Sequence, residues 1–373
     1  MPQQSKYIDS LTPLRGLAAL VVVVFHYNEF LKFMEMPLLS DGLSTHLLSK
    51  AYIWVDFFFI LSGFIITHVY AERLRSGGLE AVKAYLWARF TRLYPLHLFC
   101  MLLLVVFIQV LQRIAPNYYA SSWKPFFPIG DFIAYLGFGV SFGLVSNYSW
   151  NLPAWSIAAE WWTYVVAIGL IPLFGNRFGV RTVVAWIVAL AGLSFLGVFG
   201  DRLGLDHALD IGLYRCLFEF VIGVGVYQLY RKLNLSKSIL SADWAFVVAV
   251  LGTLAVLHFG VLPVFVLPWF SLLIICAALN YGIPSRILNS KPLRFLGEIS
   301  YSIYLLQMFW LFTWNVWFDL HWKVANPDRM PNLGELSLWL GVVLVLLVAS
   351  SALTYRFVEI AGRRKLRGLF KKV

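Results

Sequence analysis

With 373 residues, of which 60% are hydrophobic and 13% charged, the chain is too apolar for a soluble globular domain, since such domains carry about 25% charged residues. Its formal net charge of +11 does not indicate nucleic-acid binding, because the basic residues lie in loops beside apolar runs. The three cysteines lie in apolar runs without paired spacing, so neither a disulfide framework nor a metal site is expected. Without an internal repeat or a polar linker, residues 1–373 are expected to form a single transmembrane domain.

Ten apolar runs are long enough to cross a bilayer. They lie near residues 13–33, 50–70, 94–112, 153–174, 182–200, 211–230, 244–260, 264–282, 294–317 and 336–358. We therefore expect an all-α polytopic membrane protein with about ten transmembrane helices. Residues 79–92 combine a helical pattern with mixed polarity, which predicts an interfacial helix at the membrane surface.

Residues 129–147 are rich in Gly and Phe, and by composition they could cross the bilayer or lie against it. With ten crossings and a cytoplasmic N-terminus, most Lys and Arg residues fall in the inner segments. The outer loops then carry only Arg113, Lys124, Arg202, Lys323 and Arg329. This distribution follows the positive-inside rule. It predicts two cytoplasmic termini and a re-entrant or surface element at 129–147.

The first apolar run contains two ionisable residues, Arg15 and His26. Eleven residues are close to three helical turns, so both side chains lie on one helix face, with His26 roughly 16 Å deeper in the bilayer. An ionisable side chain in a membrane is costly and by default faces a polar interior where it has a function. The alternative is a packed histidine that makes a hydrogen bond between helices.

The predicted topology places three carboxylates, Asp56, Glu160 and Glu219, at about the same depth as His26. A histidine beside a carboxylate is the usual arrangement for general-base catalysis. For Asp56 and Glu160 the alternative is a structural salt bridge or a helix cap. For Glu219 the favoured interpretation is an i,i+4 pair with Arg215 that neutralises itself on one helix face.

A second polar group is expected at the inner surface, where Arg89 and Arg92 lie three residues apart, followed by Pro95. The spacing puts both guanidinium groups on one helix face. Arginine suits phosphate because its planar fork donates paired hydrogen bonds. Binding to anionic lipid headgroups is an equally good interpretation of this pattern alone.

At these residues the chain resembles acyltransferase family three, a large group of mainly bacterial integral-membrane acyltransferases. The resemblance rests on six blocks in order: the Arg-x10-His of Arg15 and His26; VDFFFILSGFII from Val55 to Ile66; Arg89, Arg92 and Pro95; Trp155, Ser156, Ile157 and Glu160; Ser300, Tyr301, Tyr304 and Leu305; and Tyr355, Val358 and Glu359. Two positions depart from the family pattern. Gln307 stands where many members have a histidine, and the proline common after the last glutamate is replaced near Ala361. Because the chain ends at Val373, it is expected to be a stand-alone member without a fused esterase-like domain.

The resemblance implies transfer of an acyl group, most often acetyl, from acyl-coenzyme A to a hydroxyl of a glycan, a lipid-linked sugar or a small natural product. Arg89 and Arg92, with Tyr301 and Tyr304, would bind the coenzyme A donor at the cytoplasmic face. His26 would act as general base or as a transient acyl carrier, oriented by Asp56 or Glu160. Arg15 would hold the donor near the entrance or stabilise charge on the thioester oxygen.

The expected location is the inner membrane of a bacterium, with membrane lipids, the acceptor and polysaccharide-synthesis proteins as partners and no nucleic acid. Exopolysaccharide, lipopolysaccharide O-antigen and periplasmic glucan remain open as acceptors, as do succinyl and longer acyl groups. Two other functions also remain open. One is a transporter with a histidine–carboxylate proton relay, and the other is a non-catalytic partner in glycan export.

Overall fold

The computed structural model describes residues 8–41, 43–145, 149–174, 178–200, 208–233 and 238–370, and within these ranges the chain forms helices and turns without strands. The longer helices are α1 (Leu11–Phe33), α2 (Trp54–Ser76), α3 (Gly78–Ile114), α6 (Ala154–Phe174), α7 (Val180–Gly200), α8 (Ala208–Lys232), α9 (Asp243–His258), α10 (Leu267–Leu279), α13 (Ser300–Trp317) and α15 (Leu333–Thr354). The shorter elements are η1 (Ala51–Ile53), α4 (Pro116–Tyr118), η2 (Tyr119–Trp123), η3 (Lys124–Phe126), α5 (Ile129–Leu136), η4 (Gly139–Phe142), η5 (Ile239–Ser241), η6 (Pro263–Val266), α11 (Ile283–Leu288), α12 (Lys291–Glu298), η7 (Phe318–Trp322), α14 (Lys323–Ala325), η8 (Tyr355–Ile360) and α16 (Ala361–Phe370).

Each of the ten apolar runs forms a helix, and the protein is an all-α polytopic membrane protein as predicted. Among the described residues, six helices are long and apolar enough to cross a membrane. The pair Lys291–Glu298 and Ser300–Ala325, bent by 67°, makes a seventh only if it is one broken span and not a re-entrant loop, and three more apolar helices are shorter. Ten crossings therefore remain a prediction.

The predicted interfacial helix near 79–92 is not a separate element. It is the first part of α3, which continues from Gly78 to Ile114 with Pro95 in its interior. Buried side chains on both sides of the proline, Tyr85 and Leu96, pack into one core cluster. This packing supports the helix through a residue that would end most helices in water, because neighbouring helices in a membrane protein stabilise the interrupted turn.

Residues 129–147 contain a helix too short to cross a bilayer, in agreement with the predicted surface or re-entrant element. Helix α5 has eight residues, about 12 Å, against a hydrocarbon core of about 30 Å. Two long-range hydrogen bonds hold the segment to the bundle. A ring nitrogen of His97 lies 2.9 Å from the carbonyl oxygen of Tyr135, and the indole N–H of Trp162 donates to the carbonyl of Phe138 at 3.0 Å. Residues 146 and 147 of this prediction lie outside the described ranges.

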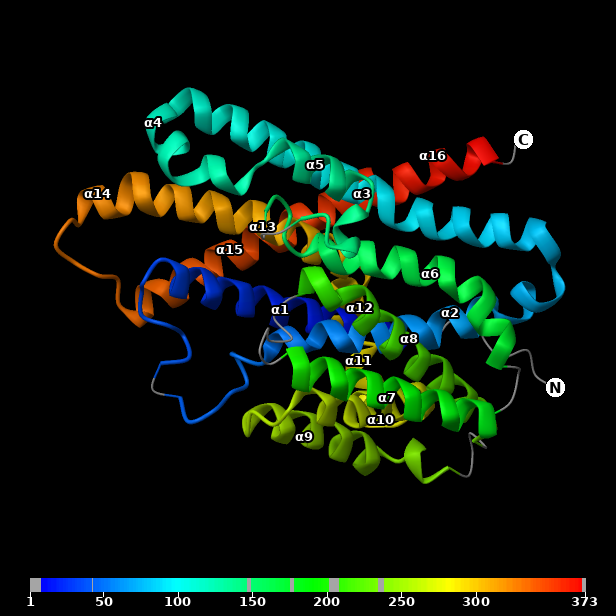
Figure 1. The fold of residues 1–373 in the computed structure, drawn as a ribbon. Helices are drawn as coiled ribbons and strands as arrows, with labels where there is room; N and C mark the ends of the chain where they lie inside the picture. Colours follow the sequence, from blue (N-terminus) through cyan, green and yellow to red (C-terminus); the bar gives the residue numbers. More distant parts are fainter. Residues whose placement is uncertain are drawn as a thin grey trace.

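Different connecting segments lie at the two ends of the helix bundle (Figure 1). The segment joining α1 to α2, together with α4 and α14, lies at one end, on the left of the view, and both chain termini lie at the other. The α2–α3 turn and α16 share the end with the termini. The predicted outer segments that carry α4 and α14 thus lie at the opposite end from the predicted inner α2–α3 turn and α16, and a cytoplasmic location of the termini stays a prediction.

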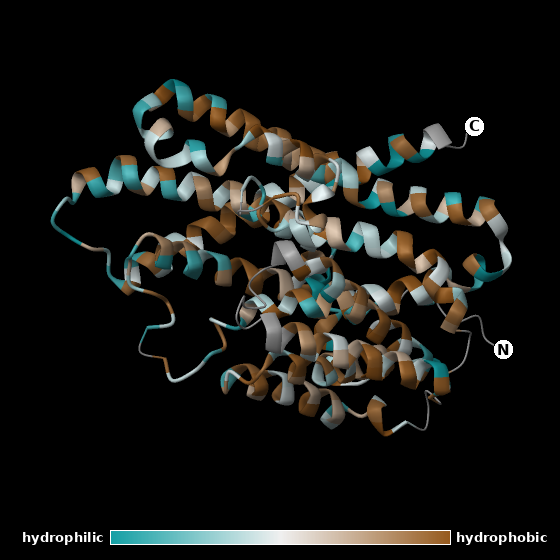
Figure 2. Cartoon of the chain, viewed as in Figure 1, coloured by the Kyte–Doolittle hydropathy of each residue, from teal (hydrophilic) through white to brown (hydrophobic). Residues whose placement is uncertain are grey.

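Close backbone contact between α2 and α8 forms the centre of the bundle. A Cβ atom added at Gly63 would lie 2.1 Å from the carbonyl oxygen of Phe220, and one at Gly223 would lie 2.0 Å from that of Ile60. Small residues let membrane helices approach in this way. On the outside, α7, α9 and α15 expose apolar side chains such as Ile187, and Figure 2 shows hydrophobic residues along the helices. Lipid contact accounts for these faces.

Candidate active site

Two cavities enter the bundle from its opposite ends. The outer cavity, at the end with the α1–α2 segment, has a volume of about 1220 Å³ and is lined by His26 among others. The inner cavity has a volume of about 140 Å³ and is lined by Arg15, Arg89 and Arg92 among others. Val55 and Tyr304 line both cavities. The two cavities are therefore adjacent, with these residues in the wall of each.

Arginine side chains from two helices dominate the inner cavity. Arg15 comes from the first turns of α1, and it has no hydrogen bond or ion pair to another described residue. Arg89 donates from Nη2 to the Tyr70 hydroxyl at 2.7 Å, and its guanidinium carbon lies 4.8 Å from that ring's centre. The Nε atom of Arg89 is buried without a hydrogen-bond partner among the described residues. The cavity thus offers free N–H donors as well as positive charge.

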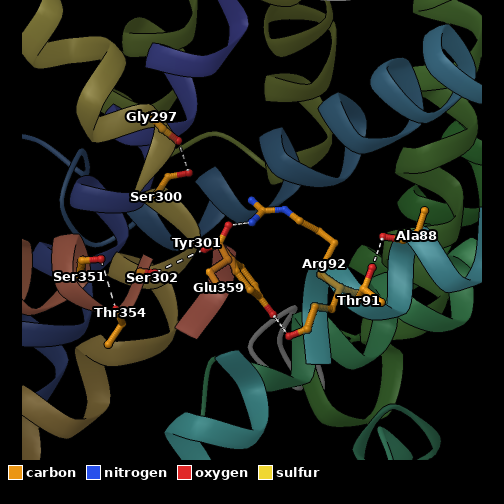
Figure 3. Close-up of polar contacts among 11 residues, drawn as sticks. Ala88, Thr91, Arg92, Gly297, Ser300, Tyr301, Ser302, Ser351, Thr354 and Glu359 are labelled. Carbon is orange, nitrogen blue, oxygen red and sulfur yellow. Dashed lines mark hydrogen bonds and ion pairs between the residues drawn. The ribbon is translucent and has the colours of Figure 1, made fainter. Parts of the chain in front are cut away.

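Arg92 is held by the C-terminal part of the chain (Figure 3). Its guanidinium group forms an ion pair with the buried Glu359 of η8 and lies over the ring of Tyr301, 5.0 Å from the ring centre. The Tyr301 hydroxyl donates to the carbonyl of Leu93 at 2.7 Å. Arg92 therefore has a fixed position, with a carboxylate where a phosphate oxygen would otherwise pair with it.

His26 contacts an amide and not a carboxylate. Its Nδ1 lies 3.0 Å from Oε1 of the buried Gln307, and Gln307 Nε2 donates to the carbonyl of Tyr304 at 2.7 Å. Because a carbonyl only accepts hydrogen bonds, this second contact places the amide oxygen of Gln307 toward His26. Nδ1 then carries the proton and donates it to Gln307. Nε2 is left as the acceptor that a general base requires.

The expected contact between His26 and a carboxylate is wrong for both Asp56 and Glu160. Asp56 accepts from Arg215 at 2.5 Å, and Arg215 also lies 3.7 Å from Glu219. Glu160 accepts from the hydroxyls of Ser62, at 2.8 Å, and Tyr164, and it lines the inner cavity with the arginines. A similar predicted depth in the bilayer was not enough to predict that these carboxylates contact His26. Side chains at one depth can point in different directions around their helices.

Arg215 is therefore shared between two carboxylates and is not neutralised by Glu219 alone. All three side chains are buried, and Arg215 also lines the outer cavity. A buried arginine needs such partners, because an uncompensated charge in a low-dielectric interior costs several kcal/mol. The salt-bridge interpretation of Asp56 agrees with this geometry.

The outer cavity has aromatic walls and mixed charge. Its lining includes Phe30, Tyr52, Trp123, Trp155 and Phe312 together with the acidic Glu29, Glu35 and Asp319 and the basic Lys32, Lys50 and Lys323. Tyr118 donates a hydrogen bond to Asp319 at 2.7 Å, and burial raises the pKa of this hydroxyl above its ordinary value. The hydroxyl therefore stays protonated and can donate at any physiological pH.

Two site residues, Gln307 and Glu359, received no catalytic or binding role from the sequence. Gln307 stood out only as a departure from a family pattern, although it follows Tyr304 by three residues on the same helix face. Glu359 is 267 positions from Arg92 in sequence, so no local spacing could pair them. Tyr304 makes one contact with its side chain and one with its backbone. Its hydroxyl lies 2.8 Å from that of Ser156, and its carbonyl accepts a hydrogen bond from Gln307.

Comparison with known proteins assigns the chain to a family. The sequence profile described as an acyltransferase domain, Acyl_transf_3, matches residues 8–355. The O-acetyltransferase OatA of Staphylococcus aureus is 23% identical over 393 residues, covering 96% of this chain and 58% of that protein. The peptidoglycan O-acetyltransferase OatA of Listeria monocytogenes is 26% identical over 331 residues, covering 80% of this chain and 49% of that protein.

A shorter match, 35% identical over 97 residues and 26% of this chain, is protein 2 in the picA locus of Rhizobium radiobacter. No solved structure matches the chain. The chain spans about half the length of the curated relatives it matches. The profile match over nearly the whole chain shows that this membrane protein belongs to the acyltransferase 3 family.

Proposed function

We propose that this protein is an integral-membrane O-acyltransferase that moves an acyl group, most often acetyl, from acyl-coenzyme A to a hydroxyl of a cell-surface glycan. The observation that carries the proposal is that Val55 and Tyr304 line both cavities, so that the two are neighbours. One cavity offers arginines for a polyanionic donor, and the other offers a histidine whose Nδ1 is held by Gln307. The relatives named as O-acetyltransferases support the reaction type.

On the donor side, Arg15, Arg89 and Arg92 bind the phosphates of coenzyme A through charge-assisted hydrogen bonds. The phosphates stay at the inner end, while the pantetheine arm extends along the inner cavity toward Tyr304. Tyr301 supports this arrangement through its contact with Arg92. The thioester then reaches the wall that the two cavities share.

On the acceptor side, Nε2 of His26 removes the proton from the acceptor hydroxyl. The oxygen attacks the thioester carbonyl, the C–S bond breaks, and the coenzyme A thiolate takes the proton from the imidazolium. Gln307 holds Nδ1–H throughout and so keeps the ring in the required tautomer. An acyl group carried briefly on His26 is the alternative route to the same product.

The proposed setting is a bacterial cytoplasmic membrane, with donor entry from the cytoplasm and the acceptor on the far side. Of the two relatives, only the name of the Listeria monocytogenes protein specifies a glycan, peptidoglycan. For this chain peptidoglycan joins exopolysaccharide, lipopolysaccharide O-antigen and periplasmic glucan as acceptors to be tested. The volume of the outer cavity, about 1220 Å³, exceeds that of most small-ligand sites and accommodates several sugar units.

The test is acetyl transfer by purified protein reconstituted in lipid vesicles. Radiolabelled acetyl-coenzyme A is supplied at one side and each glycan at the other, and labelled glycan is measured. Label should appear with wild-type protein and not with His26→Ala. Movement of unmodified glycan across the vesicle membrane, without label in either protein, would contradict the enzyme and favour a transporter.

A further inference from the structure

Helix α16 lies beside the inner end of the site and is fixed there. It follows directly after Glu359, the partner of Arg92, and it packs along α3 (Figure 1). A Cβ atom added at Gly362 would lie 2.9 Å from Cβ of Pro95, so the two helices touch at the start of α16. The close contact determines which face of α16 is turned toward the arginines of α3.

Two arginines of α16 extend the arginine group of the inner cavity. Arg363 and Arg367 are four residues apart and therefore on one helix face. Arg363 is a charged neighbour of Arg92, and Arg367 is a charged neighbour of Arg89. Arg15 is a further charged neighbour of Arg92. Arg15, Arg363 and Arg367 thus add to the positive charge around Arg89 and Arg92, and the contact of Gly362 with Pro95 places the start of α16 against α3.

The charges of this cluster are not balanced by the protein. Glu359 pairs with Arg92, and Glu160 lines the cavity. Arg363 is half-buried, and its Nε atom has no hydrogen-bond partner among the described residues, as is also true of Nε of Arg89. Buried donors without partners and repelling like charges both cost free energy. A polyanion with several phosphate oxygens would relieve both.

We propose that Arg363 and Arg367 of α16 form, with Arg89 and Arg92, a phosphate site that binds the 3′-phosphate at the nucleotide end of the donor. The inference rests on the proposed use of acyl-coenzyme A. A phosphate monoester carries about −1.5 to −2 charges at pH 7 and three acceptor oxygens, which matches several arginine forks. Headgroup phosphates of anionic lipids share this chemistry, but Arg92 lines a cavity that leads to the reaction point, and this favours the donor.

The experiment compares two nucleotides that differ only in this phosphate. Binding of coenzyme A and of 3′-dephospho-coenzyme A is measured by calorimetry on the full chain in phosphatidylcholine nanodiscs. The variants are Arg363→Gln and Arg367→Gln. The control is Lys365→Gln, which removes one charge from the opposite, exposed face of the same helix. A second set of nanodiscs contains phosphatidylglycerol, to separate the lipid from the donor as the source of phosphate.

Wild-type protein should bind coenzyme A more tightly than its dephospho form. Each arginine variant should weaken coenzyme A binding roughly tenfold, the effect of losing one charge-assisted hydrogen bond, and should bind the dephospho form almost as wild type does. Lys365→Gln should bind both nucleotides like wild type. Because Arg367 is exposed, its variant is expected to fold, and a monodisperse elution profile checks this.

Three results would overturn the site. Equal loss of affinity for both nucleotides would place the arginines away from the 3′-phosphate. Unchanged coenzyme A affinity, with an effect only in phosphatidylglycerol nanodiscs, would assign α16 to lipid headgroups. In both cases the proposed reaction would stand. Failure of wild-type protein to bind either nucleotide would instead remove the proposed function and this site with it.

Discussion

The two cavities are adjacent but differ in kind. The inner one is small and holds three arginines against Glu160, whereas the outer one is large, has aromatic walls and carries acids and bases in similar number. The excess of positive charge in the inner cavity favours a negatively charged ligand, because the arginines repel one another when no anion is bound. A balanced, aromatic surface selects by shape and by hydrogen bonds. One end of this membrane domain is therefore suited to a polyanion, and the other to a bulky polar molecule of little net charge.

The largest effect should come from His26, where the outer cavity approaches the inner one. His26→Ala removes the proposed general base and should lower acyl transfer about 10²–10⁴-fold, the usual contribution of such a group. Binding of coenzyme A, measured by calorimetry, should stay unchanged because the arginines lie in the other cavity. Wild-type turnover in this variant would contradict the proposal that donor binding and catalysis take place in different cavities.

Asp56→Asn should act on stability and not on chemistry. Removing the charge leaves Arg215 with only Glu219, at 3.7 Å, and should destabilise the protein by about 3 kcal/mol, as for other broken buried ion pairs. Thermal unfolding in detergent measures this loss. The double variant Asp56→Asn, Arg215→Gln should be more stable than the sum of the single effects, since no unpaired charge remains. If Asp56→Asn had wild-type stability but no turnover, Asp56 would have a catalytic role after all.

Substitutions in the inner cavity should lower the affinity for the donor. Arg89→Gln with Arg92→Gln removes two charge-assisted contacts and should weaken coenzyme A binding about 10²-fold. Turnover at saturating donor should change much less. The matched control is Lys83→Gln, an exposed basic residue of α3 that pairs with Glu80 and lies outside both cavities. Equal effects of the double variant and the control would mean that charge at this end acts only through long-range attraction.

Gln307 should give the smallest of these effects and the most specific. Gln307→Leu removes the acceptor for Nδ1–H of His26 and should reduce turnover about 10- to 100-fold, as loss of a histidine's orienting partner does elsewhere. Gln307→Glu restores an acceptor at the same place and should recover part of the rate. Donor affinity, measured in parallel, should be that of wild type. If Gln307→Leu and Gln307→Glu were equally impaired, packing and not the hydrogen bond would be the contribution of this residue.

Features that depend on hydropathy and charge along the chain were predictable. The ten apolar runs became helices, the short element at 129–147 does not cross as a helix, and the α1–α2 segment lies opposite the termini. The placement of Arg15 and His26 toward different ends of one helix was also correct, because eleven residues determine a rise along any helix. These predictions require only the position of each residue along its helix axis, which follows from residue spacing in the sequence.

Features that depend on rotation around a helix axis were not predictable. Asp56 and Glu160 were predicted at one depth, yet one faces Arg215 and the other faces Ser62 and Tyr164. The same limit hid the pairing of Arg92 with Glu359. The continuous α3 was missed for another reason: mixed polarity over 79–92 was taken as a sign of the membrane surface, whereas Arg89 and Arg92 of this segment line an internal cavity.

Tyr304 contributes to the site through two separate parts, its side chain and its peptide group. The residue lines both cavities, and its backbone carbonyl accepts a hydrogen bond from Gln307, which in turn contacts His26. The Tyr304 hydroxyl lies 2.8 Å from that of Ser156 on α6, so the side chain also ties α13 to α6. A substitution of this side chain therefore alters the shared cavity wall while the carbonyl that holds Gln307 stays in place.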